Sequence, residues 1–154
     1  MKRPKLLCVD NDPSIRQKYE RILGGRGYDV VLAGGGPQAL NLFHSKDNDV
    51  AAVISGYDMP GMNGAELAAE LKHCNPRLPV IMVSASQPAL EEAPHFVDAA
   101  VPKGAPVERI VSKVETLLAA RAQEEGVPLS RYVPMGAAIA GLALAGFLLP
   151  RIWE

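Results

Sequence analysis

Short apolar runs alternate with helical patterns along the first 121 positions of the chain. Apolar runs that predict buried strands occupy residues 6–9, 28–33, 50–54, 79–83 and 99–101. Apolar residues at helical spacing follow them in 13–23, 39–43, 65–73, 88–93 and 107–121. Five strand–helix units with short connections predict an α/β fold, a parallel sheet with right-handed crossovers and helices on both faces. The spacing of these units fits the flavodoxin-like, doubly wound strand order.

Length and composition narrow the class of protein. A chain of 154 residues holds one ordinary domain and a short appendage, and nothing in its nearly balanced charge, -1 in total, suggests a patch for nucleic acid. Its two cysteines and three histidines are scattered without the spacing of a metal or redox site. The basic start of the chain is followed by only four apolar residues and then Asp10, so we expect no signal peptide.

The stretch 50–64 resembles the third strand and following loop of response-regulator receiver domains (the CheY-like family). An apolar strand leads into Met-Pro-Gly-Met-Asn-Gly at residues 59–64, which is the motif that carries the resemblance. The resemblance covers residues 4 to 121 and implies the flavodoxin-like fold with five parallel strands. It also implies a role in two-component, phosphorelay signal transduction.

The resemblance implies a phosphorylation site at the carboxyl ends of the strands. In the family, an acidic pair holds Mg²⁺, an aspartate four residues before the proline accepts phosphate, and a Ser/Thr and a lysine bind the phosphoryl oxygens. These groups neutralise charge that develops in phosphoryl transfer. In this chain the corresponding residues are Asp10 and Asn11, Gly56, Ser84 and Lys103.

Glycine at position 56 has no side chain that could accept phosphate, so we expect a degenerate receiver. Asn11 retains an oxygen for a hard cation but lacks charge, and we therefore expect no cofactor, with weak Mg²⁺ binding by Asp10 and Asn11 as the alternative. Asp58 or Asp10 could act as a substitute acceptor. Asp58 would have to swing back into the cleft, and a misplacement of 1 Å can cost about a hundredfold in rate.

The remaining residues of the remnant cleft have simple structural interpretations. Lys103 is expected to pair with Asp10, and Ser84 to cap the helix that follows it. The family's usual contact face corresponds to residues 88–121. It includes Ala100, at a position where many receivers carry an aromatic residue that reorients on activation.

The last part of the chain is apolar. Residues 133–149 contain no charge, and as a helix they would measure roughly 25 Å, slightly less than a hydrocarbon core of about 30 Å. Tyr132 and Trp153 stand where interfacial aromatic residues would. The pattern predicts a C-terminal hydrophobic helix that anchors the chain in a membrane; docking on the domain or on a second copy is the alternative.

Together these features divide the chain into a receiver-like domain (4–122), a linker (123–132) and a hydrophobic tail (133–154). We expect a protein-interaction module that works without aspartyl phosphate, in the cytoplasm and tethered to the inner membrane by a single span. Its partners would be a histidine kinase or downstream effector, or further copies of itself, but not nucleic acid. An active phosphoacceptor and a membrane-associated scaffold are the alternatives. No nucleophile–base pair is evident, so we expect no enzymatic activity.

Overall fold

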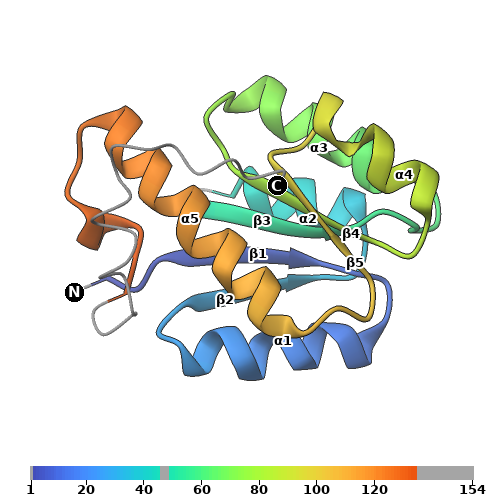
Figure 1. Ribbon diagram of the computed structural model, residues 1–154, viewed down its shortest axis with the longest axis horizontal. Helices are drawn as coiled ribbons and strands as arrows, with labels where there is room; N and C mark the ends of the chain where they lie inside the picture. Colours follow the sequence, from blue (N-terminus) through green and yellow to red (C-terminus); the bar gives the residue numbers. More distant parts are fainter. Residues whose placement is uncertain (1, 46–48, 135–154) are drawn as a thin grey trace.

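The computed structural model describes residues 2–45 and 49–134, and they form an α/β sandwich (Figure 1). Five parallel strands lie in the order β2-β1-β3-β4-β5, which confirms the predicted flavodoxin-like sheet. The strands are β1 (Lys5–Val9), β2 (Asp29–Ala33), β3 (Val50–Gly56), β4 (Val80–Ser84) and β5 (Ala99–Pro102). The helices are α1 (Pro13–Gly25), α2 (Gly36–Phe43), α3 (Gly64–Cys74), α4 (Gln87–Glu92) and α5 (Val107–Glu125), with short 3-10 turns η1 (Ala93–His95) and η2 (Leu129–Arg131).

Alternating side chains of the strands fill two separate cores. Leu6 and Cys8 of β1 point into a cluster beneath α1 and α5, whereas Leu7 and Val9 point into the cluster beneath α2, α3 and α4. All four of these side chains are fully buried. A strand that is covered on both faces must be apolar at every position, which is why the strands appear in the sequence as continuous apolar runs.

The loop after β3 is built by the motif that suggested the family. Gly61 has a φ of 84°, a left-handed conformation that glycine adopts without steric cost, and Asn63 caps α3 by accepting a hydrogen bond from the Glu66 amide at 2.9 Å. The Gly64 amide donates to Tyr57 O at 2.9 Å. A Cβ at position 64 would overlap the carbonyl oxygen of Gly56, so the glycine holds α3 directly against the end of β3.

The chain beyond α5 differs from the predicted linker at 123–132. Helix α5 continues to Glu125, four residues past the predicted end, and stops at Gly126 in a left-handed C-cap. Residues 127–133 then pack against the α1/α5 core, where Tyr132 and Val133 are 3% and 1% exposed. The expectation that Tyr132 is an interfacial aromatic is therefore wrong. The rest of the predicted tail, 135–154, lies outside the described residues.

Buried Arg121 holds this segment in place. Its guanidinium donates to Val50 O at 3.0 Å and to Ala51 O at 2.7 Å, and it pairs with Glu125 at 2.9 Å. It also lies 4.6 Å from the centre of the Tyr132 ring, while the Tyr132 hydroxyl donates to Glu125. One side chain thus joins α5, the start of β3 and the segment after α5.

Candidate functional site

Asp10 follows β1 directly and lies at the carboxyl edge of the sheet, the edge at which the strands end. Its side chain is almost buried, with 6% exposed, and Oδ1 accepts a hydrogen bond from the Asp12 amide at 2.9 Å. The Arg16 guanidinium donates to the Asp10 carbonyl oxygen at 2.6 Å. Asp12 caps α1 by accepting a hydrogen bond from the Ser14 amide at 2.9 Å. Asp10 is therefore held in one orientation by its neighbours.

Gly56 ends β3 beside Asp10. A Cβ placed on Gly56 would stand 3.1 Å from Asp10 Oδ2 and 3.7 Å from its Cγ. The other carboxylate oxygen of Asp10 therefore lies against the backbone at the position where the family pattern places the acceptor aspartate. An acidic side chain at position 56 could enter only if the Asp10 carboxylate moved.

Ser84 ends β4 and is 2% exposed. Its hydroxyl oxygen accepts from the Ser86 amide at 3.0 Å, and Ser86, not Ser84, caps α4 by accepting from the Ala89 amide at 3.4 Å. The prediction that Ser84 caps the following helix is wrong, because an N-cap residue must lie immediately before the first helical turn. Ser84 instead shapes the loop between the strand and the helix.

Lys103 follows β5, and its amide donates to Ser84 O at 2.8 Å. Its side chain is exposed, and within residues 2–45 and 49–134 its ammonium group forms no ion pair. The predicted pairing of Lys103 with Asp10 is therefore wrong. Asp10 already has the Asp12 amide on one oxygen and Gly56 against the other, and Lys103 remains in water, where it keeps its hydration.

Lys103 and Asp10 nevertheless border one cavity of about 260 Å³ between α1 and the start of α5. Lys18 and Tyr19 of α1 line it as well. Burial, together with the negative charge of Asp10, raises the pKa of the Tyr19 hydroxyl, so this tyrosine stays neutral. Asp10 and Lys103 thus share a cavity without forming an ion pair, and Asn11, Gly56 and Ser84 are not among its lining residues.

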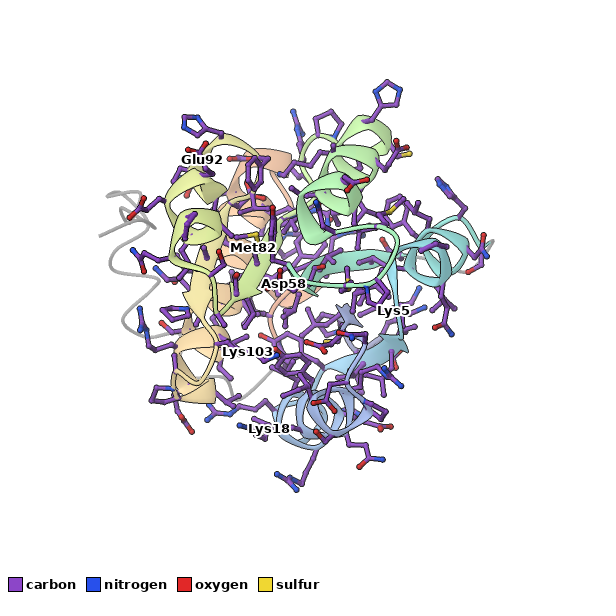
Figure 2. All side chains as sticks on the ribbon, turned by 90° about the vertical axis from the view of Figure 1, so that its right-hand side faces the viewer. Lys5, Lys18, Asp58, Met82, Glu92 and Lys103 are labelled. Atoms are coloured by element: carbon purple, nitrogen blue, oxygen red, sulfur yellow. The ribbon has the colours of Figure 1, made fainter. Side chains whose placement is uncertain are left out.

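Asp58 and Asn11 are exposed on the loops at this edge. In Figure 2, which looks onto the carboxyl edge, Asp58 and Lys103 are labelled on different loops. Among the described residues, no three His, Cys, Asp or Glu side chains lie close enough to hold a metal ion. Mg²⁺ in proteins is bound through carboxylates in near-octahedral geometry. Asp10 is the one acidic residue among the three positions, 10, 11 and 56, that correspond to the family's magnesium ligands, so these residues do not fit the family's magnesium site.

The predicted partner face runs from α4 through β5 to α5. Ala100 of β5 is half-buried and packs against the cluster beneath α2, α3 and α4. Its methyl group replaces any larger side chain at this place, so no bulky ring has to reorient there. Sequence reasoning missed the contact between Asp10 and Gly56, because it joins residues far apart in the chain.

Comparisons with known proteins agree with the fold. The sequence pattern described as "Response regulator receiver domain" matches residues 6–115. The chain belongs to the response regulator receiver domain family. Members of this family interact with histidine kinases and effectors in two-component signalling.

Named relatives carry the same domain. The chain is 29% identical over 125 residues to response regulator MprA from Mycobacterium sp. strain KMS, covering 79% of this chain and 54% of MprA. It is 39% identical over 85 residues to the DNA-binding transcriptional regulator NtrC of Escherichia coli K12, covering 55% of this chain and 18% of NtrC. The chain thus spans about half the length of MprA and a smaller part of NtrC.

Solved structures share the fold. The response regulator TrrA from Thermotoga maritima, in complex with Mg²⁺ and BeF, is 27% identical, with a TM-score of 0.68, and the match covers 74% of this chain and 98% of TrrA. A signal receiver domain of an HD domain-containing protein from Pseudomonas fluorescens has a TM-score of 0.74 at 22% identity, covering 82% of this chain and 94% of that one. The second likeness bears on the fold alone.

Proposed function

We propose that this receiver domain signals through protein–protein contacts without forming an aspartyl phosphate. The observation that carries the proposal is the geometry at the end of β3. Position 56 has no side chain, and Asp10 Oδ2 lies 3.1 Å from the point where a Cβ would stand. Phosphoryl transfer to aspartate depends on exact placement of nucleophile, metal and cations. Here the nucleophile is absent, and the cation Lys103 remains in solvent.

We also propose that the domain has no enzymatic activity and that it acts through one contact face. The face formed by α4, β5 and α5 would bind a signalling protein such as a histidine kinase or an effector. Its conformation would be set by that partner or by a second copy of the chain, because no phosphoryl group is available to shift it. The small side chain of Ala100 supports this, since the face can pack without waiting for an aromatic residue to turn inward.

Intact-mass measurement after incubation with a small phosphodonor and Mg²⁺ tests the proposal. The wild-type chain should gain no phosphoryl group. Gly56→Asp restores the acceptor, and Gly56→Asn is its matched control, equal in size but without the carboxylate. A gain by Gly56→Asp alone would mean that Ser84 and Lys103 still form a competent cleft.

A labile adduct on the wild-type chain would contradict the proposal. Peptide mapping would then decide between Asp58 and Asp10 as the acceptor. Asp58→Asn leaves the exposed loop unchanged in size and should abolish such an adduct if Asp58 carries it. The active phosphoacceptor would in that case replace the interaction module as the better description.

We further propose that the uncharged residues after Pro134 form a single membrane anchor and keep the domain in the cytoplasm. The support is the absence of charge from 134 to 150 between the packed segment and Arg151. Within residues 2–45 and 49–134, no helix is long and apolar enough to cross a bilayer. Deleting 135–154 is the appropriate test, because Val133 and Pro134 pack on the domain and must stay.

Flotation on neutral vesicles and resistance to alkaline extraction should both be lost on this deletion. A deletion variant that loses self-association instead, while neither version floats, would favour the scaffold that assembles through its tail. Unchanged thermal unfolding of the deletion variant would show that the domain itself is intact.

A further inference from the structure

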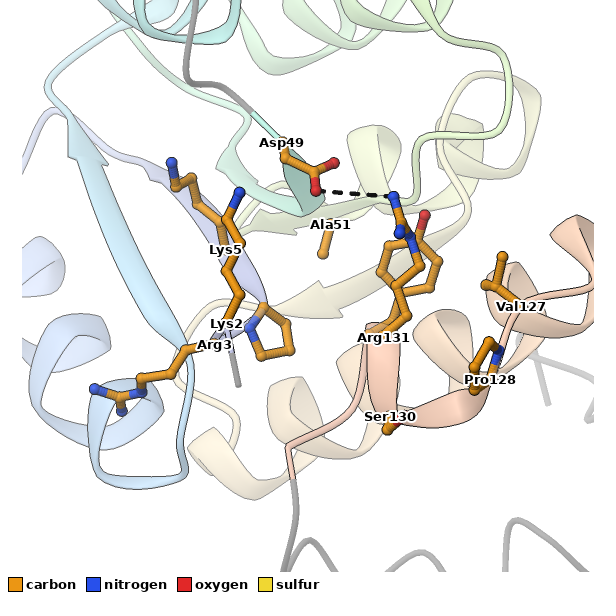
Figure 3. A pocket seen from close by; sticks show the side chains of 11 residues that line it. Lys2, Arg3, Lys5, Asp49, Ala51, Val127, Pro128, Ser130 and Arg131 are labelled. Atoms are coloured by element: carbon orange, nitrogen blue, oxygen red, sulfur yellow. Dashed lines mark ion pairs between the residues drawn. The ribbon is translucent and has the colours of Figure 1, made fainter.

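The edge of the sheet from which the strands start, here called the amino edge, lies opposite the remnant cleft. The start of β1 and the turn η2 meet there (Figure 1). They enclose a cavity of about 370 Å³ between residues 2–5 on one side and residues 127–132 on the other, with Asp49 and Ala51 between them. Figure 3 shows Lys2 and Lys5 facing Arg131 and Asp49 across this cavity.

The lining of this cavity is basic. Among the described residues that line it, Asp49 is the one acidic residue. Four cationic residues border it: Lys2, Arg3, Lys5 and Arg131. Arg26, in the loop before β2, adds a further exposed cation at the same edge, and Asp29 adds a carboxylate. Among the described residues that border this cavity, cations therefore outnumber carboxylates, which favours an anionic ligand.

Arg131 is available to a competing anion. Its guanidinium lies 4.0 Å from the Asp49 carboxylate, and both side chains are 52% exposed. An exposed ion pair at this distance contributes little free energy, so a lipid phosphodiester, which carries one negative charge and two free oxygens, can compete with the carboxylate for the guanidinium. Arg3 differs, because its guanidinium donates to Gly24 O and Gly27 O and closes the carboxyl end of α1.

The chain also leaves the domain at this edge. Pro134 packs on Gly27 in the loop between α1 and β2, where a Cβ on Gly27 would stand 2.8 Å from the Pro134 Cβ. The contacts of Arg121 with Glu125 and Tyr132 hold the preceding segment against the domain. The described part of the chain therefore ends at the same edge as the basic cavity.

From these relations we propose that the amino edge is an electrostatic seat for the phosphate groups of anionic lipids. The inference rests on the proposed membrane anchor, since a tail that begins after Pro134 would bring this edge toward the bilayer. Lipid phosphate would enter between Lys2 and Arg131 as the Asp49 pair opens. The domain would then stand with its remnant cleft and the face of α4, β5 and α5 turned away from the membrane, accessible to partners.

Energy transfer from a dye on Cys74 to an acceptor-labelled lipid measures this seating in the full chain. Cys74 is exposed at the end of α3, near the amino edge, and Cys8 is fully buried with a thiol pKa raised by burial, so one site reacts. Transfer should be stronger on vesicles that contain phosphatidylglycerol than on phosphatidylcholine alone. High salt should remove the difference.

Charge reversal identifies the surface. Lys2→Glu/Arg131→Glu should lower the ratio of seated to free domain on anionic vesicles by about thirtyfold or more, from the loss of two cations near a charged bilayer. The matched control, Lys18→Glu/Arg109→Glu, makes the same charge change near the carboxyl edge and should leave the ratio unchanged. If Arg131→Glu disturbs Tyr132, Lys2→Glu/Arg26→Glu gives the same comparison on two exposed side chains.

The outcomes of these experiments distinguish the proposed lipid-phosphate site at the amino edge from the proposed membrane anchor. Equal transfer on neutral and anionic vesicles, with flotation intact, overturns the seat and leaves the anchor standing. Salt-sensitive binding to anionic vesicles without flotation on neutral ones supports the seat and overturns the anchor. Equal losses in the two charge-reversal variants would mean that only overall charge matters, and would also overturn the seat.

Discussion

Asp10 Oδ2 lies 3.1 Å from the point that a Cβ on Gly56 would occupy. These two residues are the first acidic residue and the acceptor position of the receiver pattern. In this chain the carboxylate of one rests against the backbone of the other. The energetic cost of this contact can be measured by mutation.

Gly56→Ala tests the contact directly. Gly56 is not among the glycines with positive φ, so alanine fits the backbone and should gain about 0.4–1 kcal/mol through the unfolded chain. The 3.1 Å contact with Asp10 should cancel that gain in the wild-type background. In the Asp10→Ala background the same substitution should stabilise, with a coupling of roughly 1 kcal/mol in a double-mutant cycle by urea unfolding. Equal effects in both backgrounds would contradict the contact.

Gly64→Ala should be far more damaging. Its Cβ would overlap Gly56 O and approach Tyr57 Cα to 3.0 Å, and both are backbone atoms that no rotamer change can move. We expect a loss of roughly 2–4 kcal/mol in the free energy of unfolding, the range for overpacking and strain. Gly24→Ala in α1 is the control, because nothing lies within 4 Å of its Cβ. It should stabilise the helix by about 0.5–1 kcal/mol.

Arg121 should be essential for the segment after α5. Arg121→Met leaves the Val50 and Ala51 carbonyls and the Glu125 carboxylate without their donor. Breaking one partner of a buried pair costs about 3–5 kcal/mol, and we expect the lower part of this range because Glu125 is 20% exposed. Arg121→Lys should recover only part of the free energy of unfolding that Arg121→Met loses, since an ammonium group cannot make the hydrogen bonds of the planar guanidinium. Hydrogen exchange of residues 127–133 is the readout, and unchanged protection there would contradict this role.

Glu125 should make stability depend on pH in the acid range. Burial raises its pKa, but hydrogen bonds from Tyr132 and Arg121 outweigh burial and lower the pKa overall. A carboxyl group whose pKa is lower in the folded state binds fewer protons there than in the unfolded chain. Its contribution is therefore complete above the unfolded value of about 4.3 and is lost as the pH falls through the lowered folded pKa.

Comparing Glu125→Gln with the wild type as the pH falls checks this dependence. The difference in unfolding free energy should be largest above about pH 5 and should shrink toward acid. Tyr132→Phe removes one of the two hydrogen bonds to the Glu125 carboxylate. It should weaken the dependence of the unfolding free energy on pH without abolishing it. A constant difference between wild type and Glu125→Gln at all pH values would show that the carboxylate does not titrate with folding.

Most of the fold could be predicted because strands that are buried on both faces appear in the sequence as continuous apolar runs. Strands β1 to β5 were expected within one or two residues of their observed ends; Tyr28, included in the second predicted strand, packs as core just before β2 begins. The loop after β3 was predictable too, since its glycines and its asparagine cap are required by backbone geometry. Periodicity and turn chemistry are properties of neighbouring residues.

The side-chain partners were harder to predict. The sequence suggested that Lys103 pairs with Asp10 and that Ser84 caps a helix, and both were wrong. An exposed Lys side chain and a buried Asp can border one cavity without meeting, because orientation depends on competing hydrogen bonds such as that from the Asp12 amide. The sequence pattern does not show which of these competing hydrogen bonds forms.

The sequence by itself determined the order of strands and helices, the family resemblance and the glycine at position 56. Only the tertiary structure decided what surrounds that glycine, and that residues 127–133 belong to the domain. Val133 reads as the start of an apolar tail, yet it is 1% exposed against the core. The hydrophobic effect favours removing an apolar side chain from water but does not select the surface against which that side chain packs. For residues 127–133, the packing of α5 against β3 determines that surface.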